Sequence, residues 1–207
     1  FLSVFAAQTN SQIALNPALR IEDGELSMLT VGAGYVRTFE LLGLSARVDL
    51  RQAWKEMRWN GLLGGTTRST ERDGLDDTVL RFAVHLLGAP PVSGRDYAEY
   101  RASHPINTSL GAGVALVLPT GEYLSDRLLN IGSNRFSLRP QIGLTHERGP
   151  TAYEATGFIG LHGDNNDFLN GGRLEQDPVY TLQLHVTHTL PQGLWFSGSA
   201  AYSAGGE

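Results

Sequence analysis

Apolar and polar residues alternate with a period of two along much of this chain. In residues 44–54 the even positions are mostly apolar, whereas the odd positions include Arg47, Asp49 and Arg51. Because successive side chains of a strand point to opposite faces, this pattern predicts a strand with one apolar and one charged face. Other segments with clear alternation lie at residues 80–86, 136–144 and 180–190.

Weaker versions of the pattern bring the expected number of strands to about nine. These weaker segments lie at residues 1–7, 29–39, 110–118, 153–161 and 194–202. Long connections alternate with short ones between the expected strands. We place the long ones at residues 8–28, 60–76, 120–135 and 163–178, and the short ones at 40–43, 147–150 and 190–193. Residues 88–107 break this rhythm, and we expect a short helix at 93–103, capped by Ser93.

Alternating segments of about ten residues, joined by turns that are short on one side and long on the other, are typical of membrane β-barrels. A soluble β-sandwich or a lipocalin-like barrel would also alternate, with its apolar face inward. The loop rhythm favours the membrane barrel, as do aromatic residues near the expected strand ends, which resemble interfacial girdles. These aromatics are Tyr35, Phe39, Trp54, Trp59, Phe136, Tyr153, Tyr180, Trp195 and Tyr202. We therefore predict an all-β fold, an antiparallel transmembrane β-barrel.

The composition of the chain argues against several other classes of protein. Charged residues make up 18% of the chain, below the roughly 25% of a typical soluble domain. The longest apolar run, residues 110–118, is far shorter than the roughly 20 residues of a spanning helix. A net charge of -5 gives no basic surface for nucleic acid. The absence of cysteine excludes disulfides and thiolate metal sites.

The number of strands carries an expectation about the length of the protein. Bacterial single-chain barrels close with an even number of strands, so nine strands are an incomplete set. We expect residues 1–207 to be one barrel domain that continues beyond its C-terminus, with about twelve strands in the full-length protein.

Several motifs, in order along the chain, resemble a known family. The most specific are Leu-Pro-Thr-Gly-Glu-Tyr at residues 118–123, Leu-Asn-Ile-Gly-Ser-Asn-Arg-Phe at 129–136, Asp-Asn-Asn-Asp-Phe at 164–168 and Gly-Leu-Trp at 193–195. Weaker matches include Gly-Leu-Asp-Asp at 74–77. The chain resembles the outer-membrane proteins of the MetA pathway of phenol degradation, although Phe136 stands where members usually have Trp. The resemblance implies a bacterial outer-membrane location and a role in moving aromatic or other small hydrophobic compounds.

If the apolar faces meet lipid, the opposite faces line a polar lumen. The expected lumen residues are Arg47, Asp49, Arg51, Arg81, His85, Arg139, Gln141, Glu154, His162, Gln183 and His185. Such a lining could set which solutes pass, because rings of charge control selectivity. Equally, these residues could form a salt-bridged plug in a narrow barrel.

External loops supply a second set of candidates, namely Asn130, Asn134, Arg135, Asp164, Asn165, Asn166 and Asp167. The loop at 120–135 is either an inward gate or solute site, or a segment whose asparagines satisfy its own backbone. Residues 164–167 resemble a calcium loop in composition but lack the EF-hand spacing, so we expect an Asx-rich turn and no metal site.

No catalytic motif is present. There is no Gly-x-Ser-x-Gly elbow, and the histidines are scattered. We expect a channel or transporter for small, hydrophobic or aromatic compounds, neither an enzyme nor a cofactor protein. A plugged structural or assembly barrel is the alternative, and a lipid-modifying enzyme is less favoured. The expected partners are outer-membrane lipid, lipopolysaccharide and a small hydrophobic solute, with no nucleic acid, while the sequence names no protein partner.

Overall fold

A computed structural model describes residues 1–13, 21–63, 66–91 and 94–206. The expected cap Ser93 lies outside these ranges. The long strands are β1 (Leu2–Ile13), β2 (Ile21–Leu41), β3 (Leu44–Leu63), β4 (Thr66–Leu75), β5 (Thr78–Leu87), β6 (Ile106–Leu118), β7 (Ser137–Arg148), β8 (Thr151–His162), β11 (Val179–Thr189) and β12 (Trp195–Gly205). Two short strands, β9 (Asn165–Phe168) and β10 (Gly172–Leu174), form a hairpin, and the helix α1 covers Gly94–Ser103.

The long strands form one antiparallel sheet of ten strands. Nine of them follow the order β1-β2-β3-β5-β6-β7-β8-β11-β12, and β4 pairs with β3 beyond the end of β5. The nine-strand path agrees with the nine alternating segments of the sequence. Within the described residues, the edge strands β1 and β12 each pair on one side only.

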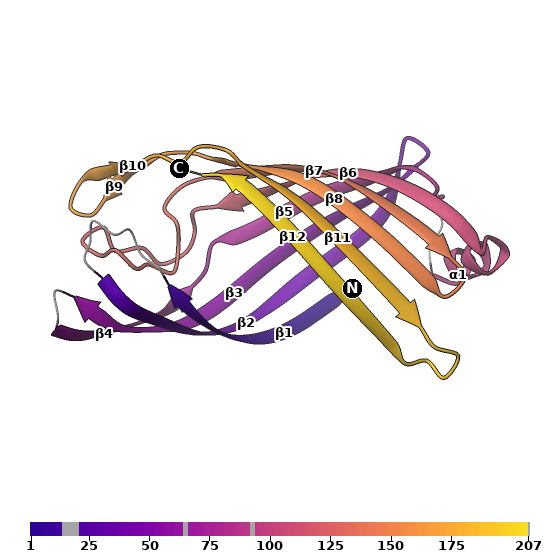
Figure 1. Cartoon of the computed structure of the whole chain (residues 1–207). Helices are drawn as coiled ribbons and strands as arrows, with labels where there is room; N and C mark the ends of the chain where they lie inside the picture. The colour runs from indigo at the N-terminus through magenta and orange to yellow at the C-terminus, as the bar shows by residue number, and fades with distance from the viewer. Residues whose placement is uncertain (14–20, 64–65, 92–93, 207) are drawn as a thin grey trace.

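The sheet is strongly curved, and its charged face is the concave one. Asp49 on β3 and Phe158 on β8 line the same cavity, although β5, β6 and β7 lie between their strands. Side chains separated by three strands can share a cavity only if the sheet curls around it. Figure 1 shows these strands tilted and wrapped into a barrel wall.

The convex face is apolar and exposed. Leu182 and Leu184 on β11 are 51% and 50% exposed, and Ile142 on β7 is 53% exposed. The buried hydrophobic side chains among the described residues are Ala46, Met57, Trp59 and Ile131, too few for the closed core of a soluble barrel. The predicted fold, an antiparallel barrel of the transmembrane kind, is therefore confirmed.

The connections differ at the two ends of the wall. At the short-turn end, residues 42–43, 149–150 and 190–194 join β2 to β3, β7 to β8 and β11 to β12. The helix α1 lies at this end, whereas β4 and the β9–β10 hairpin lie at the opposite, long-loop end (Figure 1).

Two of the expected long loops are wrong, because much of each is strand. β1 and β2 pair through Ile13 and Gly24, and β3 and β4 form a hairpin within the expected loop at 60–76. These extensions contain polar residues on both faces, so they lack the alternation by which strands were recognised. Backbone hydrogen bonding to a neighbouring strand does not need an apolar face, and the strands run on past the apolar band.

One residue of the expected aromatic girdle is also misplaced. Trp59 lies on the same face of β3 as Asp49 and Arg51 and is only 7% exposed. Its ring covers Gly61, where an added Cβ would lie 2.5 Å from Trp59 Cζ2. The other eight aromatics of that set are at least 36% exposed.

Candidate functional site

Inner-face residues from five strands surround a cavity of about 190 Å³ in the middle of the wall. Strand register sets a row across the sheet, with Asp49 opposite Arg81, Arg81 opposite Ala115, and Ala115 opposite Arg139. The cavity is lined by Asp49, Arg51, Val79, Arg81, Ala115, Arg139, Gln141 and Phe158. Five of the expected lumen residues are thus brought together here.

A second cavity of about 210 Å³ lies next to the first on the same face. Arg47, His85 and Gln141 line it, together with Gly111 and Gly143 on neighbouring strands. The glycines have no side chains to fill the space between β5 and β8. Because Arg81 and Gln141 border both cavities, the two form one polar stretch of the inner wall.

The remaining expected lumen residues lie on β8 and β11 and line neither cavity. Glu154 lies opposite His185, and Gln183 lies opposite Thr156. His162 pairs with Ser137 at the long-loop end of the wall, with Nδ1 2.9 Å from the hydroxyl oxygen.

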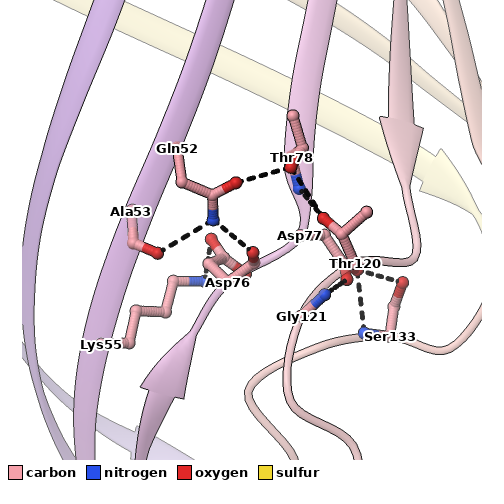
Figure 2. Close-up of polar contacts among 9 residues, drawn as sticks. All are labelled: Gln52, Ala53, Lys55, Asp76, Asp77, Thr78, Thr120, Gly121 and Ser133. Carbon is pink, nitrogen blue, oxygen red and sulfur yellow. Dashed lines mark hydrogen bonds and ion pairs between the residues drawn. The ribbon is translucent and has the colours of Figure 1, made fainter.

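The mouth of the barrel at the long-loop end is organised by Asp77, which is only 6% exposed. Its Oδ1 accepts a hydrogen bond from Gly121 N at 2.9 Å, and its Oδ2 accepts from Ser133 N at 2.8 Å and Ser133 Oγ at 2.5 Å. Figure 2 shows this carboxylate between the two ends of the loop at 119–136. One carboxylate at the β4–β5 junction thus ties down both ends of that loop.

The same junction is tied to the wall by neighbouring side chains (Figure 2). Thr78 Oγ1 donates to Gln52 Oε1 at 2.5 Å, and Gln52 Nε2 donates to Asp76 O at 2.7 Å. Lys55 forms an ion pair with Asp76 at 2.7 Å. These bonds occur where β3 changes its partner from β5 to β4.

Asn165 links the two long loops and is 1% exposed. Its Nδ2 donates to Tyr123 Oη at 2.8 Å, and its Oδ1 accepts from Asn134 Nδ2 at 2.9 Å. Tyr123 Oη in turn donates to Asp167 O at 3.1 Å. The loops therefore pack on each other through buried polar contacts, and Asn134 bonds to the neighbouring loop as well as adopting a left-handed φ of 51°.

The other loop candidates have local roles in the structure. Asn130 Oδ1 accepts from Leu124 N at 2.7 Å, and Asn130 Nδ2 donates to Leu124 O and Arg127 O. The side chain thus satisfies the backbone of its own loop, which is one of the two roles the sequence left open. Asn166 and Asp167 are exposed on the β9–β10 hairpin.

Two loop arginines bridge neighbouring segments. Arg135 donates to Gln176 Oε1 at 2.5 Å, and its burial lowers the pKa of its guanidinium, partly offset by Asp164. Arg173 contacts Asp164 at 2.5 Å, and this hydrogen bond raises the pKa of its guanidinium. Both guanidinium groups stay charged near neutral pH, because the ordinary pKa of arginine lies far above neutrality.

Hydroxyl groups contact several histidines, which bears on the enzyme alternative. Ser199 Oγ lies 2.5 Å from His185 Nδ1, but His185 Nε2 contacts Thr187 Oγ1 at 3.0 Å. A catalytic triad needs a carboxylate on the second ring nitrogen. Among the described residues, no carboxylate is hydrogen-bonded to His185 or to His162.

In the described part of the chain, no group of three or more His, Asp or Glu side chains could hold a metal ion. None of the helices there has the length and apolar character required to cross a membrane. A hollow of about 510 Å³ on the outer face is lined mainly by apolar residues, among them Pro140, Ile142 and Tyr180, which matches the apolar character of that face.

Sequence reasoning missed Asp77 and Tyr123 as organising residues. Asp77 lies 44 residues from Gly121 and 56 from Ser133, so no local pattern reveals these bonds. The sequence did contain one indication of their importance. Asp77 is the last residue of the motif at 74–77, and Tyr123 is the last residue of the motif at 118–123, and both motifs resemble the family.

A curved antiparallel sheet with an apolar outer face and a charged inner face defines a β-barrel of the transmembrane class. The chain belongs to the family described as "Putative MetA-pathway of phenol degradation", whose model matches residues 7–207. Its fold is similar to the crystal structure of the COG4313 outer membrane channel from Pseudomonas putida F1, with a TM-score of 0.74 at 19% identity, over 100% of this chain and 72% of that chain. No curated protein sequence matches the chain.

Proposed function

We propose that this protein is a channel of the bacterial outer membrane for small solutes, including hydrophobic and aromatic compounds. The proposal rests on one observation: one face of the sheet is apolar and the other face is charged. The exposed leucines of β11 suit lipid, whereas the inner face is lined by charged groups and contains cavities of about 190 and 210 Å³. Charged groups are tolerable on an inner wall if they are paired or hydrated.

The fold similarity to an outer membrane channel supports this proposal. The loops at the mouth also support it. Contacts of Asp77 and Asn165 hold two loops at one end of the wall, and neither residue lines the inner cavity of about 190 Å³. The expected partners at the outer face are membrane lipid and, on the loop side, lipopolysaccharide.

A plugged barrel is the second candidate function. A plug would need its inner charges mutually neutralised, because isolated charges in a dry lumen are costly. Arg47 and Asp49 form such a pair. However, Arg51, Arg81 and Arg139 have no ion pair among the described residues, which favours a hydrated lumen over a dry plug.

Flux measurements on the full-length protein test the channel. Purified protein in liposomes should pass small neutral solutes, read as swelling faster than in protein-free liposomes. Fractionation of bacterial membranes should recover the protein with the outer membrane. Swelling indistinguishable from that of protein-free liposomes would exclude the channel and leave the plugged barrel.

A further inference from the structure

The cavity of about 190 Å³ has an unbalanced charge. Asp49 is its one carboxylate, and it is 1% exposed. Arg47 Nε lies 2.9 Å from both oxygens of Asp49, and Arg47 Nη2 also contacts Oδ1. The carboxylate that could neutralise this part of the wall is therefore already held by an arginine of its own strand.

Three further arginines line the cavity, namely Arg51, Arg81 and Arg139. Within the described residues, no hydrogen bond or ion pair is formed by the side chains of Arg51, Arg81 or Arg139. Arg81 Nε is buried without a hydrogen-bond partner. A buried donor of this kind costs free energy unless water or a ligand satisfies it. The cavity thus presents one buried, unsatisfied guanidinium donor, from Arg81, beside the exposed guanidinium groups of Arg51 and Arg139.

Small and apolar residues leave room between these arginines. Ala115 lies between Arg81 and Arg139 in the register of the sheet. Val79 and Phe158 add apolar surface to the same cavity. A volume of 190 Å³ corresponds to roughly six water molecules in the liquid, at about 30 Å³ each, which suits a solute with a single ring.

We propose that this cavity selects small organic anions, specifically carboxylates attached to one aromatic ring. The inference rests on the channel function proposed above and names its solute class. A guanidinium binds a carboxylate through two parallel hydrogen bonds, while Phe158 and Val79 contact the ring. Rings of arginine or lysine are the usual basis of anion selectivity in pores.

Planar-bilayer recordings of the full-length protein in a salt gradient test the charge part of the proposal. The reversal potential should indicate preference for anions over cations. The triple variant R51Q/R81Q/R139Q should lose most of this preference, a several-fold drop in the anion-to-cation permeability ratio. R58Q is the matched control, because Arg58 on β3 is 61% exposed, pairs with Glu56 and Glu71 and does not line the cavity. It should leave the ratio unchanged.

Liposome swelling tests the ring and carboxylate part. Sodium benzoate should enter faster than benzamide, a neutral molecule of the same shape. It should also enter faster than sodium chloride, and this advantage should be larger in the original protein than in the variants. The variant R51K/R81K/R139K keeps the charge but loses the paired donors of guanidinium. It should retain anion preference while losing most of the advantage of benzoate over chloride. Because the lysine variant retains charge and conductance, it also distinguishes loss of selectivity from misfolding.

The outcomes separate this inference from the channel function. A protein that passes neutral solutes but shows equal permeability for anions and cations overturns the inference and leaves the channel standing. Anion preference that survives in R51Q/R81Q/R139Q also overturns it. If no solute of any charge passes, the channel function fails, and the solute class fails with it.

Discussion

The two ends of the barrel wall are held together by different kinds of interaction. At the short-turn end, β2 and β3 are joined by Leu42 and Gly43, whose φ values of 52° and 79° form a tight hairpin turn. At the long-loop end, Asp77 and Asn165 hold segments that are 31 to 56 residues apart in the chain, through buried side-chain hydrogen bonds. One end therefore depends on local backbone conformation, and the other depends on a few buried polar groups.

The difference predicts how each end responds to substitution. A turn substitution changes the conformational free energy of two residues, about 1 kcal/mol. Loss of a buried polar group at the loop end removes several hydrogen bonds at once and leaves their partners unsatisfied. Four substitutions test this contrast, from the largest expected effect to the smallest.

Asp77→Ala should have the largest effect. It removes three hydrogen bonds to Gly121 and Ser133, and each bond to a charged group contributes about 1.5–3 kcal/mol. We expect the loop at 119–136 to detach, with its local stability reduced by about 3 kcal/mol or more. Hydrogen exchange of Gly121 N and Ser133 N measures this loss. Asp126→Ala, at an exposed position of the same loop, should leave exchange unchanged, and equal exchange in the two variants would contradict the proposed anchor.

Asn165→Ala should separate the two long loops from each other. Its amide bonds Tyr123 and Asn134 and accepts from Asp167 N, so its loss leaves buried partners unsatisfied at a cost of about 1–3 kcal/mol. Faster cleavage of the β9–β10 hairpin by protease would report the change. Asn166→Ala alters an exposed neighbour and serves as control; similar cleavage of both variants would rule out the buried link.

Gly121→Ala tests the close approach of the loop ends. An added Cβ would lie 2.7 Å from Gly132 Cα and 2.8 Å from Asp77 N. Backbone atoms at such distances must shift, which costs about 1–3 kcal/mol. The expected result is a lower unfolding midpoint together with faster exchange of the Gly132 amide. Gly157→Ala is the matched control, because no atom lies within 4 Å of its added Cβ, and it should change neither measurement.

Leu42→Asn should have the smallest effect, with the opposite sign. Leu42 has a left-handed φ of 52° and is 95% exposed, so it contributes strain and little packing. Asparagine tolerates this conformation, and Asn-Gly is the preferred hairpin pair. We expect a gain of up to about 1 kcal/mol in the free energy of unfolding, measured by urea titration in lipid vesicles. Gly43→Ala should lose a similar amount, and a gain in both would refute the argument from backbone conformation.

The alternation of residue types determined much of this structure without any tertiary information. The pattern of Arg47, Asp49 and Arg51 against Val48 and Leu50 assigned each side chain to a face, because a strand turns successive residues to opposite sides. That assignment holds whatever the partner strand, so nine wall strands and most of the inner-face residues could be predicted. The strand β4 and the ends of β2 and β3 could not, since the alternation of the central segments breaks down there. In β3, for example, the apolar side chains move from even positions such as Val48 and Leu50 to Met57 and Trp59.

Only the tertiary structure decided which inner residues meet. Register and curvature bring Asp49, Arg81 and Arg139 to one cavity. Within that cavity the carboxylate of Asp49 is hydrogen-bonded to Arg47 and not to Arg81 or Arg139. The same long-range geometry makes Asp77 the anchor of a loop that begins more than 40 residues later. A single sequence states the face on which each side chain lies, whereas its neighbours on that face depend on strand pairing, which is a property of the folded sheet.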